Sequence, residues 1–242
     1  MVQLEVVAWG LLAASSLGLG ALLGMFRPWP ERLVGLVLGF GAGALVSAIS
    51  FELAGEGLRE AGLGPVAVGM AAGALAFYAL AGASDRFSER RALSDAVAGG
   101  TGIALALGAI LDGIPEMLVL GIQLSYGQGL SLPLILAIFV SNLPEAMASA
   151  AELHKQGADR LRIAGLWGTI TVGLAAVTPI GAAVADRLGP GATAAFNGFA
   201  AGALLVMLVD AMAPEARGKA DRVSGLATTL GFTASVALNS IS

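Results

Sequence analysis

The chain contains no cysteine, a single histidine and few charged residues for its length. Only 12% of its 242 residues are charged, about half the share found in a soluble domain. The lack of cysteine excludes disulfides, thiolate metal sites and cysteine nucleophiles. Thirteen lysines and arginines stand against 17 aspartates and glutamates, and the resulting net charge of -4 excludes a general nucleic-acid-binding protein.

Apolar residues dominate instead, at 57% of the chain with a mean hydropathy of +0.84. The length allows about eight membrane crossings of roughly 20 residues each, with short connections. We therefore predict an all-α, polytopic membrane protein whose residues 1–242 form a single transmembrane domain. Its eight predicted helices lie approximately at Val2–Phe26, Leu33–Leu58, Gly64–Ala83, Ala96–Leu124, Leu130–Leu153, Ile163–Ala185, Ala192–Met212 and Val223–Ile241.

The basic residues are unequally shared between the two sides of this predicted bundle. Of the 13 lysines and arginines, only Arg59 and Arg187 fall on the side of the two termini, and the other 11 fall on the opposite side. Because basic residues gather on the cytoplasmic side, both termini are predicted outside the cytoplasm of a cell (inner) membrane. The first apolar segment has no basic residue before it and carries Glu5, so we expect a retained helix rather than a cleaved signal peptide.

Two pairs of segments resemble each other. Gly39–Leu45 in the second predicted helix matches Gly198–Leu204 in the seventh, and Leu111–Glu116 in the fourth matches Val140–Glu145 in the fifth. In each pair the two helices run in opposite directions under the predicted topology. Similarity between oppositely directed segments indicates an inverted repeat, which in transporters places the substrate site near the middle of the membrane.

Three carboxylates lie in the middle of the fourth and fifth predicted helices: Asp112, Glu116 and Glu145. Each costs about 2.5–3.5 kcal/mol in the bilayer, and no lysine or arginine lies within the eight cores to neutralise it. Asp112 and Glu116 are four residues apart, as are Ser141 and Glu145, so each pair shares one helix face. We predict a divalent-cation site made by these four residues and Asn142. Protonation of the acids is the alternative.

Pro115 and Pro144 occupy matched positions, each directly before one of these glutamates. A proline has no N–H, so each leaves the carbonyl four residues earlier without its helical partner. These two carbonyls, of Leu111 and Val140, would add oxygen ligands beside the acids. A simple packing kink is the alternative for either proline taken alone.

Three further acids are candidate pathway residues. Glu52 and Glu56 are four residues apart near the outer end of the second helix, and Asp210 lies near the inner end of the seventh, before Pro214 and Glu215. The first two would form an entrance funnel or a proton route, and Asp210 would receive ions. For all three the alternative is an interfacial position among lipid headgroups.

Small residues recur every four positions in two helices, at Gly35, Gly39 and Gly43 and at Gly69 and Gly73. Such runs let helix backbones approach closely. They predict either tight helix contacts within the chain or a homodimer.

With these motifs the chain resembles the Zrt/Irt-like (ZIP) family of divalent metal transporters, especially its compact bacterial branch. The family carries His-Asn-x-Pro-Glu-Gly on helix 4 and a similar motif on helix 5. Here the matching runs are Asp112–Met117 and Ser141–Ala146. The resemblance implies eight helices in a 3+2+3 arrangement with both termini outside. Helices 1–3 (about residues 2–83) and 6–8 (about 163–241) would be inverted repeats around helices 4–5 (about 96–153).

The resemblance also assigns ligands. It implies that Glu116, Asn142 and Glu145 match metal ligands, while Asp112 and Ser141 occupy the two histidine positions. Gly113 replaces an asparagine ligand, and the sixth helix has no acid, which favours one bound ion over two. Oxygen ligands suit Mn, Mg, Ca or Fe(II), whereas the family favours Zn or Fe, so the ion stays open.

The predicted function is therefore transport, by alternating access and in the uptake direction, of a divalent cation held between the fourth and fifth helices. We expect no enzymatic activity, no cofactor beyond the transported ion, and the lipid bilayer as partner. One alternative is a degenerate, non-transporting member that acts as a metal sensor or a structural membrane partner. Another is an intramembrane aspartyl protease in which Asp112 would pair with Asp210.

Overall fold

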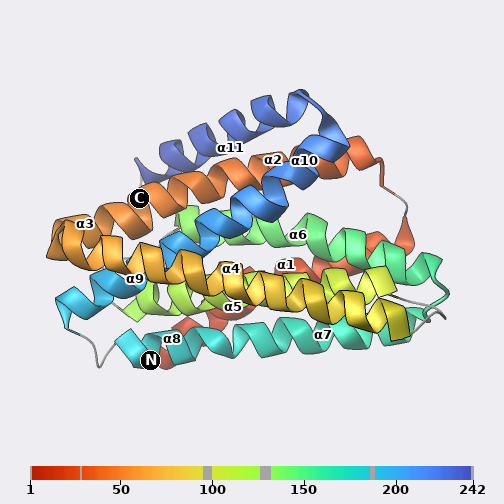
Figure 1. Ribbon diagram of the computed structural model, residues 1–242, viewed down its shortest axis with the longest axis horizontal. Coiled ribbons are helices and arrows are strands. Elements are labelled where there is room, and N and C mark those ends of the chain that lie inside the picture. The colour runs from red at the N-terminus through yellow and green to blue at the C-terminus, as the bar shows by residue number, and fades with distance from the viewer. Residues whose placement is uncertain (1, 28, 95–99, 126–131, 186–188, 241–242) are drawn as a thin grey trace.

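Helices make up almost all of residues 2–27, 29–94, 100–125, 132–185 and 189–240, which the computed structural model describes (Figure 1). These residues form no strand. The elements are α1 (Val2–Phe26), α2 (Glu31–Ala48), η1 (Ile49–Ala54), α3 (Gly55–Ala61), α4 (Leu63–Ser94), α5 (Gly100–Ser125), α6 (Leu132–Lys155), α7 (Arg160–Ala175), α8 (Val177–Ala185), α9 (Pro190–Met207), η2 (Leu208–Met212), α10 (Ala213–Ala220) and α11 (Val223–Asn239).

Seven of the helical stretches are long and apolar enough to cross a membrane, and α11 is an apolar helix of 17 residues. Both ends of the first predicted span coincide with those of α1, and the eighth begins with α11 at Val223. The sixth span is divided between α7 and α8, and the second and seventh each continue through a π-helical segment into a further short helix. Ala96, Leu130 and Ile241, predicted as span ends, and Arg187 lie outside the described residues.

Two helices are longer than predicted. α4 continues past Ala83 to Ser94, and α10 carries the seventh span past Met212 to Ala220. Residues 83–94 contain no glycine or proline, so nothing in the chain ends the helix at the polar boundary. The basic residues at 86, 90, 91, 217 and 219 therefore lie on helix ends, whereas the sequence analysis assigned them to connections.

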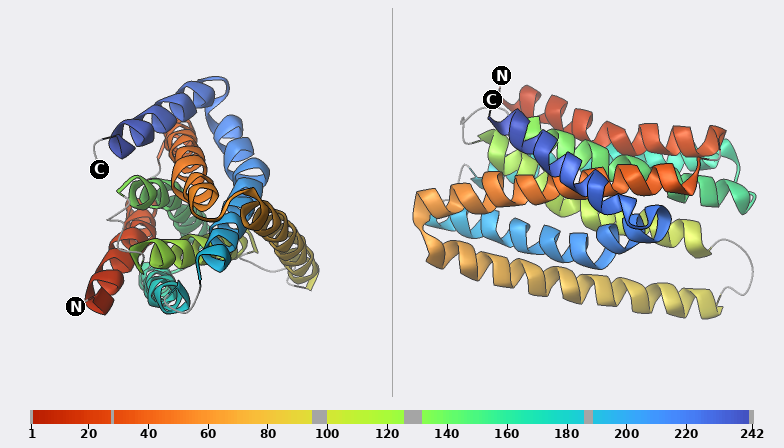
Figure 2. Two further views of the ribbon diagram at one scale, coloured as in Figure 1. Left: turned by 90° about the vertical axis from the view of Figure 1, so that its left-hand side faces the viewer. Right: turned by 90° about the horizontal axis from the view of Figure 1, so that it is seen from above.

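α5 and α6 pack against each other, and α1, α2, α7, α8 and α9 pack around them (Figure 2). α4 and α11 lie at the periphery. α1 begins and α11 ends at the same end of the bundle. The two helices that carry the predicted site are therefore packed against each other and against several neighbours.

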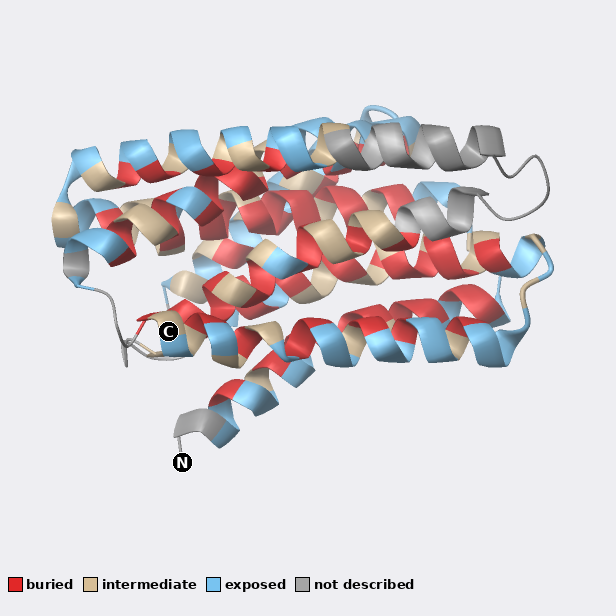
Figure 3. Ribbon diagram, turned by 60° about the horizontal axis from the view of Figure 1, so that its bottom comes forward, coloured by how far each residue is buried: buried red, intermediate tan, exposed pale blue. Residues whose placement is uncertain are grey.

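The bundle exposes many apolar side chains and buries several polar ones within a mainly apolar core. Leu63, Val68 and Leu75 on α4 are exposed by 68–70%, whereas Glu116 and Asn142 are each 1% exposed. Figure 3 shows the buried residues on the inward faces of the helices. An apolar exterior around buried carboxylates is compatible with a polytopic membrane bundle.

The two matched glycine segments make equivalent contacts. On α2, a Cβ added at Gly43 would lie 1.9 Å from the carbonyl oxygen of Thr228 on α11. On α9, a Cβ added at Gly202 would lie 2.0 Å from the carbonyl oxygen of Met70 on α4. The small-residue runs therefore pack helices of the same chain against each other.

Each matched segment also continues into a π-helical segment. η1 begins at Ile49, ten residues after Gly39, and η2 begins at Leu208, ten residues after Gly198. The two helices that contain them run in opposite directions (Figure 1). The sequence analysis did not predict these segments, which are rare in proteins and are found frequently at functional sites.

Candidate metal site between α5 and α6

Glu116 lies at the centre of the candidate site. It is buried on α5 and accepts hydrogen bonds from two side chains of α6. Asn142 Nδ2 donates to Glu116 Oε2 over 2.6 Å, and Ser141 Oγ lies 3.3 Å from Glu116 Oε1. Ser141 Oγ also lies 3.0 Å from the carbonyl oxygen of Ile138. The structure thus brings together three residues that the sequence analysis assigned to one site.

Glu145 lies one turn along α6 from Ser141. Its Oε2 atom is buried and has no hydrogen-bond partner among the described residues. The carboxylate of Glu145 interacts electrostatically with those of Asp112 and Glu116, so the fifth predicted member of the site, Asp112, belongs to the same group. A buried carboxylate oxygen without a donor is costly, and an ion or a proton would relieve that cost.

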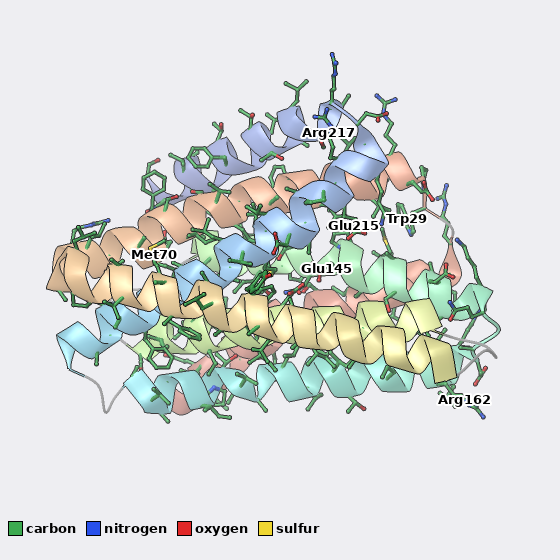
Figure 4. All side chains as sticks on the ribbon, in the orientation of Figure 1. Trp29, Met70, Glu145, Arg162, Glu215 and Arg217 are labelled. Carbon is green, nitrogen blue, oxygen red and sulfur yellow. The ribbon has the colours of Figure 1, made fainter. Side chains whose placement is uncertain are left out.

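Glu215 on α10 is a fourth acid in this group. It interacts electrostatically with both Asp112 and Glu145, and Figure 4 shows the neighbouring positions of Glu145 and Glu215 on α6 and α10. The sequence analysis did not assign Glu215 to the site. The similar segments contained the signal: Glu215 is 17 residues after Gly198, as Glu56 is 17 residues after Gly39.

The described side chains do not form a complete coordination shell. Among these residues no three histidine or acidic side chains lie close enough together to hold a metal ion. The oxygens of Glu116 are engaged by Asn142 and Ser141, and Asn142 presents its N–H₂ group, where a ligand would present its oxygen. The residue types fit a cation that prefers oxygen, and binding would require the amide to turn and the acids to converge.

Both prolines lie inside continuous helices. α5 passes through Pro115 and α6 through Pro144 without interruption. The irregular helical geometry that the structure shows lies instead in η1 and η2, on the neighbouring helices.

Of the predicted pathway residues, Glu52 and Glu56 are half-buried and lie beside α5. Gln123 Nε2 donates to the backbone carbonyl of Glu52 over 3.1 Å, and the Gln123 side chain interacts with the carboxylate of Glu56. Gln123 is seven residues beyond Glu116, a rise of about 10 Å along the helix. These acids thus form a second polar group, separate from the first.

Asp210, by contrast, is exposed on η2. Glu215, rather than Asp210, is the acid of the seventh span that faces the candidate site. Gln123 belongs to neither of the motifs and to neither pair of similar segments. Only its polarity within an apolar helix sets it apart in the sequence.

Protein-family models and the sequences of curated proteins were both compared with the chain, and none matches it. The resemblance to the ZIP family thus depends on the motifs described above.

Proposed function

We propose that this chain is a ZIP-type transporter of a divalent metal cation, which binds between α5 and α6 and crosses by alternating access. One observation carries the proposal: Asp112, Glu116, Glu145 and Glu215 interact within the helical bundle, and one oxygen of Glu145 has no donor. Four negative charges repel each other where the dielectric constant is low, and a divalent cation reverses the sign of that interaction. Carboxylate, hydroxyl and amide groups are ligands for such an ion.

The proposal includes an inverted repeat of the helices on either side of α5 and α6. α2 and α9 run in opposite directions, pack through glycines against α11 and α4, and continue into π-helical segments at equal offsets. These equivalences support the 3+2+3 arrangement around α5 and α6. Rocking of the repeats about that central pair would open the site to each side in turn.

The distribution of basic residues supports a cell-membrane location with both termini outside the cytoplasm. In that orientation Glu52 and Glu56 lie toward the outside, and Glu215 lies toward the cytoplasm. Movement from the first group to the second is uptake.

Ion flux into liposomes tests the proposal. Wild-type protein is expected to move Mn²⁺, Zn²⁺ or Fe²⁺ down a gradient, and Glu116→Ala with Glu145→Ala is expected to lower the flux at least about tenfold. Glu5→Ala, which removes an exposed carboxylate from α1, is the matched control and should transport normally. Unchanged flux in the double variant would contradict the site.

The same preparation separates the alternatives. A sensor would be stabilised against heat by the ion without moving it across the bilayer. The protease alternative requires Asp112 and Asp210 to face each other, but Asp112 is buried on α5 and Asp210 is exposed on η2. The geometry therefore favours transport over proteolysis.

A further inference from the structure

Beyond the acids, a pocket with both charged and apolar lining, here called the basin, opens at the end of the bundle where α2 begins and α6 ends. Its volume is about 340 Å³, and it is lined by Trp29, Glu31, Glu152, Lys155 and Lys219, among others. Both of its lysines lie on the side predicted to be cytoplasmic. The basin thus adjoins the part of α10 that carries Glu215.

Lys219 links the basin to the acids. It forms an ion pair with Glu215, one turn earlier on α10, in which the two side chains are only 24% and 33% exposed. Lys155 also lines the basin. Its Nζ atom lies 3.8 Å from Glu152 Oε2, farther than Lys219 lies from Glu215, and the Lys155 side chain is 72% exposed. A partly buried pair is stronger than an exposed one because water screens it less.

The ion pair between Lys219 and Glu215 places a positive charge next to the candidate site. Glu215 contacts Lys219 and also interacts with Glu145, whose Oε2 atom has no hydrogen-bond donor (Figure 4). The ammonium group of Lys219 and a divalent cation would therefore compete for the same negative charge.

We infer that Lys219 is a tethered counter-ion that competes with the transported cation for Glu215 and closes the site toward the basin. When the ion arrives, the ammonium group leaves Glu215 for the basin, which the carboxylate of Glu31 also lines. When the ion departs, the ammonium group returns, which favours release and hinders rebinding. The inference rests on the proposed function and assigns a positioning role to a residue outside the ligand set.

The test is a Mn²⁺ titration of the full-length protein in detergent, followed by Mn²⁺ flux in liposomes. Lys219→Gln is expected to bind Mn²⁺ about tenfold more tightly and to turn over more slowly, because the competing charge is gone. The glutamine keeps the Cβ atom that lies beside Gly35, so packing between α10 and α2 is preserved. Lys219→Arg should behave as wild type, and Lys155→Gln should change the affinity less than twofold.

A second background separates competition from a structural effect. In Glu215→Gln protein, Lys219→Gln should change Mn²⁺ affinity less than twofold, because the lysine no longer has its partner. Wild-type binding with an unchanged affinity in Lys219→Gln would overturn this inference alone. Failure of wild-type protein to bind either Mn²⁺ or Zn²⁺ would overturn the proposed function and this inference with it.

Discussion

Glu116 illustrates how single residues define the site. Its two oxygens accept hydrogen bonds from Asn142 and Ser141 of the facing helix. These bonds link α5 to α6. A bound cation would pair with the carboxylate of Glu116 in place of these hydrogen bonds, and both donors would become free.

The proposed ligands are all oxygen atoms, which predicts a preference for harder cations than Zn²⁺. The double substitution Asp112→His and Ser141→His would supply two imidazoles at the positions that histidines occupy in the ZIP family motifs. We expect the ratio of Zn²⁺ to Mn²⁺ affinity to rise about tenfold or more in the double variant. Competition titrations measure this ratio, and an unchanged ratio would contradict the argument from ligand softness.

At the scale of elements, glycines let the peripheral helices approach the matched segments closely. Gly43 on α2 and Gly202 on α9 each face a backbone carbonyl of the opposing helix, where no Cβ fits. Association of helices in lipid depends on such close packing, because burial of apolar surface offers no gain there. The contact between α2 and α11 and that between α9 and α4 therefore have the same physical basis.

Gly43→Ala is expected to destabilise the protein by about 1–3 kcal/mol, because its Cβ would collide with the carbonyl oxygen of Thr228. Gly225→Ala is the matched control on α11, since Gly225 is exposed and has no atom within 4 Å of an added Cβ. The control should be neutral or slightly stabilising, because alanine favours helix more than glycine. Thermal unfolding in detergent compares the two, and equal midpoints would disprove the packing argument.

At the scale of the whole molecule, α5 and α6 pack against each other between α1 and α2 on one side and α8 and α9 on the other (Figure 2). One polar group, around Glu52, Glu56 and Gln123, lies toward one end of the bundle. The other, around Glu145 and Glu215, continues into the basin at the opposite end. A route between these groups would pass along the inner face of α5.

The absence of cysteine makes the predicted membrane orientation directly testable. Gly64→Cys, in the first turn of α4, should react with a membrane-impermeant maleimide added to intact cells. Asp159→Cys, between α6 and α7, should react only after the membrane is opened. Both positions are exposed, so a lack of labelling reports the side of the membrane on which the residue lies and not its burial. The reverse labelling pattern would invert the proposed direction of transport.

The sequence by itself determined the helical class, the approximate spans and the acids of α5 and α6. Span length follows from bilayer thickness, and spacing by four fixes which residues of a straight helix share a face. The prediction that Glu116, Ser141 and Asn142 share one site used the span positions and the spacing by four. The structure has these residues in contact.

Only the tertiary structure decided that Glu215 joins the acids while Asp210 is exposed, and that Lys219 lies between them and the basin. The reason is η2: an extra residue in a helical turn shifts the phase of everything after it by about 100°, so the α-helical period no longer gives the face. The same applies to η1 and Glu56. Which face such a helix presents depends on the helices packed around it.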